Sequence, residues 1–438
     1  MITKPIRYYL AIILVLPVIP SFSQKQEKLR AKIDELAAQY EPGVIEWRHH
    51  LHQYPELSNR EFNTSAFIAE KLRSFGLEVK TGIAHTGVIG ILKGGKSGPV
   101  IALRSDMDAL PVKERVPLDW ASHEVAEFNG QEVGVMHACG HDTHMSILLG
   151  TARILSEIRN DIKGTVKFIF QPAEEGAPEG EEGGAELMVE EGVLQDPNVE
   201  VIFGLHIISD IGVGKIQYKP EGAMAASNSF RIKVMGKQSH GSSPWKGIDP
   251  IVTSAMIING LQTTVSRQAE LTKEAAVVTV GSIHGGIRHN IIPEEVEMIG
   301  TIRTLDSAMR EKIFEDIRRT ATMIASSQGA VAEVFIDKGV PVTYNDPRLT
   351  AMMLPTLEES AGKDNVILGK AITGAEDFAF YQQKVPGLFF FLGGMPSDIN
   401  PKDAFPHHTP DFFVADEGMI LGIRTFCYLV LDYPDKAR

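Results

Sequence analysis

The sequence is poor in long apolar runs. The apolar run near its N-terminus, residues 8–19, falls short of the roughly 20 residues that a membrane-spanning helix needs. Lys4 and Arg7 precede this run and the small-residue segment SFS at 21–23 follows it, which is the layout of a secretory signal peptide. We therefore expect residues 1–23 to be a signal peptide, the mature protein to have no membrane span, and its location to be periplasmic or secreted.

Basic residues are also scarce. The chain has 43 lysines and arginines against 56 aspartates and glutamates, which gives a formal net charge of −13. An acidic surface repels polyanions, so nucleic acid and anionic membranes are excluded as partners. We expect the partner to be a small molecule.

Cysteine is almost absent. The 438-residue chain has two, Cys139 and Cys427, and an exported protein could join them in a disulfide. Cys427, however, lies in the apolar run 426–430, which favours a buried thiol. Cys139 lies among histidines in the segment GVMHACGHDTHM, residues 134–145, which favours a metal-bound thiolate. We prefer this second arrangement to the disulfide.

The length of the chain indicates two domains. Over most of it, short apolar strands alternate with helices. Residues 223–340 instead follow the order strand, helix, strand, strand, helix, strand, which is the ferredoxin-like arrangement. We expect an α/β fold, in which a catalytic domain (24–222 and 341–438) has a mostly parallel sheet flanked by helices and the ferredoxin-like α+β domain is inserted at 223–340. The strands of the main sheet are expected near residues 87–92, 100–104, 165–170, 201–205 and 388–392.

Acidic and histidine residues follow the ends of four of these strands. Ligands of open α/β sheets bind beyond the carboxyl ends of the strands, so we expect these side chains to meet at one edge. They are Asp106 and Asp108, Glu174 and Glu175, His206, and His407 and His408.

The cysteine and histidine segment begins just before an expected helix at residues 145–158. We expect Asp142 or Thr143 to cap this helix, and the positive end of the helix to favour a thiolate at Cys139. The alternative to a metal site is that these histidines are solvent-exposed and bind no ligand, and that the lone cysteine is only a small buried apolar side chain. The acids and imidazoles elsewhere in the chain favour a metal site, with five candidate ligands: Cys139, His141, Glu175, His206 and His408.

Five ligands and a bridging water suit two divalent ions about 3.5 Å apart. Cysteine and histidine favour zinc, with manganese, cobalt and nickel as alternatives. Glu174 is adjacent to a candidate ligand and could take a proton from a metal-bound water. The alternative for the Glu174–Glu175 pair is a solvated loop, but the flanking Pro172 and Gly176 indicate a fixed turn.

The mature chain resembles the M20 metallopeptidases along nearly its whole length. It is most similar to the branch of amidohydrolases that split N-acyl amino acids, such as hippurate hydrolase, aminoacylase-like carboxypeptidases and plant auxin-conjugate hydrolases. The segments that carry the resemblance, in order, are LHQYPELSNREF (51–62), RSDMDALPV (104–112), MHACGHDTHM (136–145), FQPAEEG (170–176), GLH (204–206), GKQSHGSSP (236–244), NIIP (290–293), AEDF (375–378) and HHTP (407–410).

The resemblance implies a role for each residue of the candidate metal site. Cys139 would bridge two metal ions, Glu174 would be the general base, and His408 rather than His407 would be the last ligand. Asp108 would orient a ligand without binding metal.

By the same resemblance, the inserted domain would be a lid and the dimerisation domain of a homodimer. Its His240 would reach the active site of the partner subunit and stabilise the oxyanion, and Asn290 and Arg303 would hold the substrate carboxylate, for which an arginine fork is suited. Glu376, in the segment AEDF, would be a further substrate contact.

These expectations combine into a metal-dependent hydrolase of N-acyl amino acids. A metal-bound water, with Glu174 as general base, would split the amide bond and release a carboxylic acid and a free amino acid. A dipeptidase or carboxypeptidase of the same family is the main alternative. A periplasmic binding protein would also be exported and have two α/β lobes, but it would not need a spare acid beside five ligands.

Overall fold

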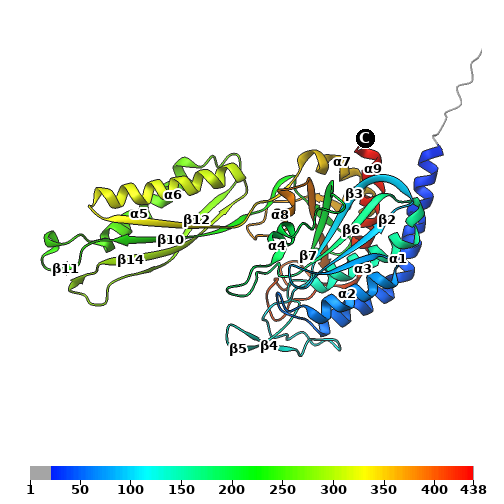
Figure 1. Cartoon of the computed structure of the whole chain (residues 1–438), viewed down its shortest axis with the longest axis horizontal. Coiled ribbons are helices and arrows are strands. Elements are labelled where there is room, and N and C mark those ends of the chain that lie inside the picture. Colours follow the sequence, from blue (N-terminus) through cyan, green and yellow to red (C-terminus); the bar gives the residue numbers. More distant parts are fainter. Residues whose placement is uncertain (1–20, 438) are drawn as a thin grey trace, which may run out of the picture.

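The computed structural model describes residues 21–437. The chain forms a main unit and a second, elongated unit that extends away from it (Figure 1). The expected signal peptide, residues 1–23, lies outside the described residues except for its last three, which begin the first helix. None of the helices in residues 21–437 is long and apolar enough to cross a membrane.

The main unit is built on an eight-stranded, mixed sheet with the order β1-β2-β6-β3-β7-β18-β8-β17. The pairs that run from β6 through β3 and β7 to β18 are parallel, as is the pair β8–β17. The other pairs are antiparallel. The strands are β1 (Glu78–Ile83), β2 (Gly87–Lys93), β3 (Lys96–Asp106), β6 (Lys163–Gln171), β7 (Val201–Gly212), β8 (Ile216–Tyr218), β17 (Val366–Leu368) and β18 (Gly387–Met395).

Helices cover both faces of this sheet, as Figure 1 shows. Apolar side chains of α1, α2, α3, α7 and α9 form the larger core on one face. Those of α4 and α8 pack on the other face. Because the central strands are covered on both sides, they are continuous apolar runs rather than alternating ones. The helices are α1 (Ser21–Gln53), α2 (Phe62–Ser74), α3 (His141–Glu157), α4 (Gly184–Glu190), α7 (Pro347–Ala361), α8 (Ala379–Gln382) and α9 (Met419–Lys436).

The start of α3 differs from the expectation. The helix begins at His141, so neither Asp142 nor Thr143 caps it. The preceding residue, Gly140, has a left-handed φ of +91°, and a Cβ there would come within 2.5 Å of Ile207. Glycine is therefore required for this tight turn, which places His141 in the first turn of the helix.

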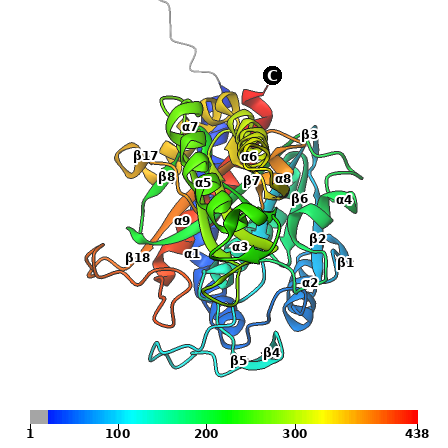
Figure 2. The ribbon, with the colours of Figure 1, turned by 90° about the vertical axis from the view of Figure 1, so that its left-hand side faces the viewer.

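The second unit is a four-stranded antiparallel sheet in the order β12-β14-β10-β15, with two helices on one face. This is the order of a ferredoxin-like fold, as expected. Figure 2 looks along this unit, and its two helices lie in front of the main unit. Its elements are β10 (Ala226–Met235), β11 (Ser239–His240), α5 (Pro250–Thr263), β12 (Ala276–His284), β13 (Ile291–Ile292), β14 (Glu295–Thr304), α6 (Ser307–Ser327) and β15 (Val331–Val340).

Two short paired strands connect the units. The strand β9 (Glu221–Met224) leads into the inserted unit and pairs with β16 (Thr343–Asn345), which follows it. A further hairpin, β4 (Val125–Phe128) and β5 (Gln131–Gly134), projects from the lower edge of the main unit in Figure 1.

Candidate metal centre and active site

The five side chains expected to bind metal come from five different segments and form one cluster. The sulfur of Cys139 lies 3.4 Å from Nε2 of His206 and 3.3 Å from Nε2 of His408. Oε1 of Glu175 lies 3.1 Å from Nε2 of His408 and 3.9 Å from Nε2 of His141. The segments are the loop before α3, the start of α3, the loops after β6 and β18, and strand β7.

The cluster fits a two-metal centre. Ligand atoms of Cys139, Glu175 and His408 lie within 4.8 Å of one another, and so do those of His141, Glu174 and Glu175. Among the described residues, the buried Nε2 of His141 has no hydrogen-bond partner. Buried polar atoms are normally partnered, and thiolate, imidazole and carboxylate together suit zinc or another divalent transition ion.

Hydrogen bonds on the outer side of two histidine rings orient them toward the cluster. Nδ1 of His141 donates to the carbonyl oxygen of Asp108 at 2.8 Å, and Nδ1 of His206 donates to the carbonyl oxygen of Ile207 at 2.6 Å. A carbonyl oxygen only accepts, so each Nδ1 carries a hydrogen. Each Nε2 is therefore the atom turned toward the metal position, the usual arrangement of a histidine ligand.

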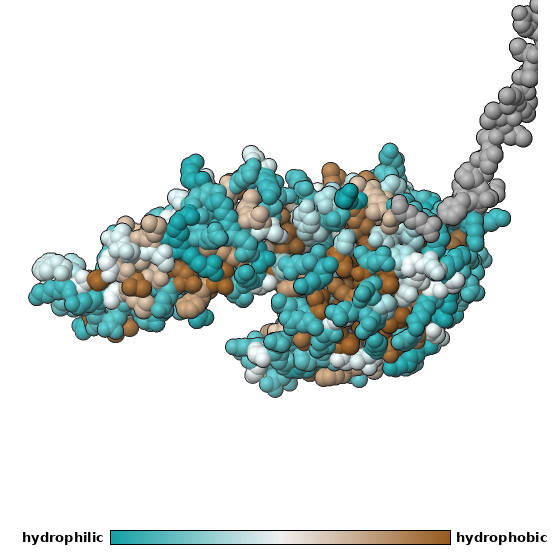
Figure 3. Space-filling view, turned by 45° about the horizontal axis from the view of Figure 1, so that its top comes forward, coloured by the Kyte–Doolittle hydropathy of each residue, from teal (hydrophilic) through white to brown (hydrophobic). Residues whose placement is uncertain are grey.

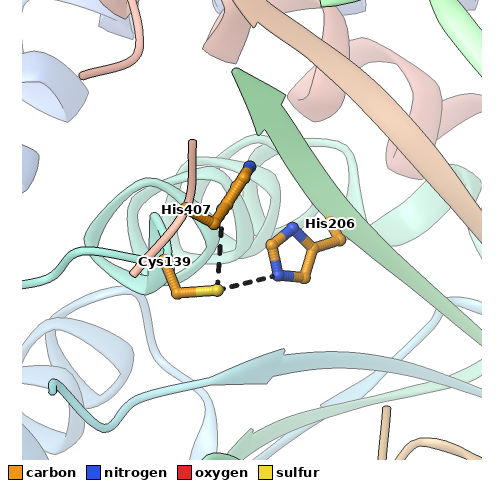
Figure 4. A group of neighbouring side chains, drawn as sticks. All are labelled: Cys139, His206 and His407. Atoms are coloured by element: carbon orange, nitrogen blue, oxygen red, sulfur yellow. Dashed lines mark hydrogen bonds between the residues drawn. The ribbon is translucent and has the colours of Figure 1, made fainter. Parts of the chain in front are cut away.

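His407 and His408 lie beside the same sulfur but are held differently. Figure 4 shows the side chains of His407 and His206 next to the sulfur of Cys139, joined to it by dashed lines. Nε2 of His407 accepts the backbone N–H of Ser209 at 3.2 Å, so its Nδ1 carries the hydrogen and donates to the sulfur of Cys139 at 3.6 Å. His408 instead contacts both Cys139 and Glu175. This geometry favours His408 as the ligand and makes His407 a donor to the sulfur.

Both cysteines are free thiols in the structure, so the alternative disulfide is not formed. Burial and the charges of Glu175 and Glu174 raise the pKa of the Cys139 thiol well above its usual value. The expected stabilisation of a thiolate by the start of α3 is therefore outweighed. A bound cation would offset both causes, so metal binding and loss of the thiol proton are coupled.

Asp108 holds the backbone that carries the two adjacent glutamates. Its two carboxylate oxygens accept the backbone N–H groups of Glu174 and Glu175, each at 3.0 Å, and the hydroxyl of Ser58 at 2.7 Å. With its carbonyl oxygen bound to His141, Asp108 contacts the segments of two candidate ligands. Asp108 thus positions both segments through its carboxylate and its carbonyl oxygen.

Glu174 lies among other acids at the inner wall of the cluster. Burial, and then the charges of Glu376, Glu175 and Asp377, raise the pKa of Glu174 well above its usual value. Arg104 opposes this effect, and its guanidinium lies 3.0 Å from Glu376 and 2.8 Å from Asp377. A buried carboxyl with a raised pKa, next to candidate metal ligands, is suited to accept and return a proton near neutral pH.

Two further residues of the first helical turn of α3 are engaged outside the cluster. Nδ1 of His144 lies 2.6 Å from Asp106, and its Nε2 accepts the backbone N–H of Ile207 at 2.8 Å. Asp142, rather than capping the helix, accepts hydrogen bonds from Arg48 at 3.1 Å and His52 at 3.0 Å. Both nitrogens of His144 are thus used, so the ring is not a metal ligand.

The expected substrate contacts fall into two groups. Arg303 and Glu376 line a cavity of about 560 Å³ that also contains Cys139, Glu174 and His206. His240 and Asn290 do not reach this cavity within one chain. His240 is in β11, which lies at the far tip of the inserted unit in Figure 1, and Gly241 beside it is hydrogen-bonded to Asn290. Neither residue is among the side chains that line the cluster cavity.

Glu61 lies in the segment 51–62 that carries the family resemblance, but its spacing and hydropathy do not reveal its role in the site. Its carboxylate is fully buried, accepts the backbone N–H of Ala173 at 3.0 Å and the hydroxyl of Thr86 at 2.6 Å. Ala173 has a left-handed φ of +53° and directly precedes Glu174. Glu61 and Asp108 therefore hold three consecutive backbone N–H groups. The partner of Glu61 is 112 residues away in the chain, and only alignment of relatives would have marked it.

Replacing Glu61 by alanine is expected to lower kcat by roughly 10-fold or more, because the unpartnered Ala173 N–H costs about 1–3 kcal/mol and releases the turn that carries Glu174. Glu61→Gln keeps an acceptor for that N–H and should retain most of the activity. Kinetics and thermal denaturation of both variants provide the measurement. Equal losses of kcat in the two variants would indicate that the charge of Glu61, and not its hydrogen bond, matters.

His52 is held between two acids behind the cluster. Its ring nitrogens lie 3.0 Å from Asp142 and 3.2 Å from Glu114. Burial lowers the pKa of His52, but hydrogen bonds to these carboxylates and their charges outweigh it and raise the pKa to about 9. The ring is therefore protonated in the folded protein at neutral pH.

His52→Gln is expected to destabilise the protein in a pH-dependent way. Because the folded pKa of about 9 exceeds the ordinary value of 6.5, the stabilisation is complete below pH 6.5 and is lost as the pH rises through about 9. The difference in Tm between wild type and variant should shrink over this range. Thermal denaturation at several pH values measures it, and a constant difference would contradict the assignment.

Comparison with known proteins agrees with this geometry. Residues 102–432 match peptidase family M20/M25/M40. Thermostable carboxypeptidase 1 of Saccharolobus solfataricus is 39% identical, and the match covers 94% of this chain and 99% of the carboxypeptidase. N-acetyl-L-cysteine deacetylase of Bacillus subtilis is 37% identical, and the match covers 89% of this chain and 87% of the deacetylase. A crystal structure from Bacillus subtilis, described as a dinuclear metal-binding peptidase from the M20 family, is 35% identical, covers 91% of this chain and 99% of its own, and has a TM-score of 0.76. The chain therefore belongs to peptidase family M20 and is a hydrolase that acts on amide bonds.

Proposed function

We propose that the protein hydrolyses the amide bond of N-acyl amino acids and releases a carboxylic acid and a free amino acid. The observation that carries this proposal is that one cavity is lined both by Glu174, beside the metal-binding cluster, and by Arg303. Within residues 21–437, Arg303 has no ion-pair partner, so it is available for the carboxylate of an amino acid. Relatives named N-acetyl-L-cysteine deacetylase and IAA-amino acid hydrolase ILR1-like 4 support this substrate class.

The metal ions would be held by the five-residue cluster. Two divalent ions there would polarise the amide carbonyl and lower the pKa of water. Zinc is our first choice because the ligands include a thiolate and imidazoles, with manganese, cobalt or nickel as alternatives. The ligands are Cys139, His141, Glu175, His206 and His408.

Glu174 would move the proton in both halves of the reaction. Its carboxylate takes a proton from the attacking water and later gives it to the nitrogen of the leaving amino acid, so that the amine departs neutral. The raised pKa of Glu174 suits the second transfer, and the hydrogen bonds that the backbone N–H groups of Glu174 and Glu175 donate to Asp108 keep the turn fixed through both. Arg303 binds the amino-acid carboxylate and so orients the amide toward Glu174.

We also propose a homodimer formed through the inserted unit. The tip that carries His240 and Asn290 lies at the far end of the inserted unit in Figure 1 and does not line the cluster cavity of its own chain, and a second copy would let it complete a site. In that position His240 would stabilise the oxyanion that develops on the amide carbonyl. Light scattering tests the dimer, and a monomer with full activity would contradict this role of His240.

We further propose that the protein is exported, on the basis of the signal-peptide layout of residues 1–23. Fractionation of cells into periplasm, medium and cytoplasm, followed by detection of the chain, tests this. Recovery of uncleaved protein in the cytoplasm alone would contradict it.

A product screen tests the proposed reaction. The metal content of the purified protein is measured first. The protein is then incubated with N-acetyl amino acids, N-benzoyl amino acids and dipeptides, after zinc, manganese, cobalt or nickel has been restored in turn. We expect free amino acid from the acyl amino acids. Release of amino acid from dipeptides alone would instead favour a carboxypeptidase activity, as in the name of the relative thermostable carboxypeptidase 1.

A further inference from the structure

The hairpin formed by β4 and β5 ends in a two-residue turn, Asn129–Gly130. Phe128 pairs with Gln131 across the hairpin, and the two turn residues have positive φ angles of 52° and 75°. Asn-Gly is a common sequence for such a turn, because both positions need a left-handed backbone. Both residues are exposed, and a Cβ on Gly130 would meet no atom within 4 Å. The space around the backbone of Gly130 is therefore open.

Few contacts hold this turn in place. In the described part of the chain, β4 and β5 pair only with each other, and the hairpin projects from the main unit (Figure 1 and Figure 2). An isolated two-stranded sheet is at best marginally stable. Within residues 21–437, the side chain of Asn129 makes no hydrogen bond. Local opening of the turn therefore breaks few contacts.

An asparagine that precedes a glycine can react with its own backbone when the turn opens. The backbone nitrogen of Gly130 loses its proton and forms a bond to Cγ of Asn129, the bond between Cγ and Nδ2 breaks, and Nδ2 leaves as ammonia with that proton. Water then opens the cyclic imide at one of its two C–N bonds. Cleavage at Cγ gives aspartate, and cleavage at the main-chain carbonyl gives isoaspartate. Glycine favours ring closure because it has no side chain to hinder the approach of its nitrogen.

We propose that Asn129 is a site of spontaneous deamidation in the folded protein. The product adds one negative charge, and isoaspartate also adds one carbon to the backbone of the turn, which disrupts the pairing of Phe128 with Gln131. Asn129 and Glu175 line the same cavity of about 500 Å³, and Glu175 also lines the cluster cavity. The new charge therefore arises in a space that borders the candidate metal centre. This inference does not depend on the proposed substrate.

A second Asn-Gly pair in the chain, Asn259–Gly260, provides a matched control. Asn259 is also exposed, and it lies in α5 of the inserted unit, whose surface mixes hydrophilic and hydrophobic residues (Figure 3). Its side-chain amide donates to the carbonyl oxygen of Ala255 at 3.0 Å. The N–H of Gly260 lies inside the helix, where hydrogen bonding to the preceding turn keeps the nitrogen away from Cγ of Asn259. We expect this pair to stay intact.

The experiment incubates the purified protein in neutral buffer and then measures both pairs by proteolysis and mass spectrometry. Conversion of Asn129 to the acid should be faster than conversion of Asn259 by about 10-fold or more, because opening a packed helix costs more free energy than opening a hairpin turn. Isoaspartate should appear at position 129, since the cyclic imide is its source. In denaturant, where neither the turn nor the helix remains, the two pairs should convert at similar rates.

Asn129→Gln tests the chemistry directly. Glutamine keeps an amide at the turn but would have to close a larger ring, so the variant should show no conversion at this position during the same incubation. The wild-type comparison holds even if this variant folds poorly, because both pairs are measured in one sample. A rate at Asn129 no higher than that at Asn259 in the folded protein would overturn the proposal. Aspartate at position 129 without isoaspartate would overturn it as well.

Discussion

Glu174→Gln is expected to lower kcat by about 10²–10⁴-fold, the usual contribution of a general base. Glutamine has nearly the same shape, and the backbone of the turn stays bound to Asp108, but the amide cannot take a proton from water. The variant should therefore retain the metal content and the substrate KM of wild type. Steady-state kinetics and elemental analysis of the same preparation measure both.

Glu182→Gln is the matched control for this change. Glu182 is an exposed glutamate further along the same loop. Its replacement by glutamine therefore removes an equal charge at a position outside the cluster, and the kcat of the Glu182→Gln variant should equal that of wild type. If Glu174→Gln instead loses metal, the side chain is a ligand, which its distance of 3.8 Å from Nε2 of His141 would permit. A near-normal rate with normal metal content would remove Glu174 from the mechanism.

Local patterns in the sequence were sufficient to predict most elements of the fold. The helix α6 is amphipathic, with Asp306 accepting the backbone N–H of Met309 at its start, and its bounds follow from that pattern. The main strands are continuous apolar runs bounded by turn residues, so their positions also follow directly. Residues placed just beyond their carboxyl ends meet in the structure because parallel strands bring these ends to one edge.

Contacts between distant segments could not be predicted in this way. The pairing of Arg104 with Asp377 joins residues 273 positions apart, and neither hydropathy nor spacing marks either one. The start of α3 was misplaced because Gly140 adopts a left-handed conformation, so the chain enters the helix earlier than a side-chain cap would allow. His407 and His408 are adjacent in sequence, so hydropathy and spacing do not separate them; the resemblance selects His408, and their separate hydrogen bonds give the physical difference between donor and ligand.

Cys139→Ala is expected to abolish tight metal binding. The sulfur lies 3.3 to 3.6 Å from ring nitrogens of His206, His407 and His408, so its loss removes the ligand at the centre of these three contacts. The affinity for zinc should fall by more than the roughly 10–100-fold that loss of an outer hydrogen-bond partner costs, and activity should fall with it. Competition with a chromogenic chelator gives the affinity.

The same variant tests the coupling between metal and proton. Burial and neighbouring carboxylates raise the pKa of the Cys139 thiol, so the metal-free protein carries a proton there at neutral pH and must release it when the metal binds. At zinc concentrations high enough to saturate both proteins, zinc added to metal-free wild type in weakly buffered solution should release one proton more than zinc added to Cys139→Ala. Cys427→Ala is the matched control, because Cys427 is buried in α9 away from the cluster, and it should release as many protons as wild type. Equal release by wild type and Cys139→Ala would show that the sulfur is not a ligand. This conclusion holds even if Cys139→Ala and Cys427→Ala are less stable than wild type.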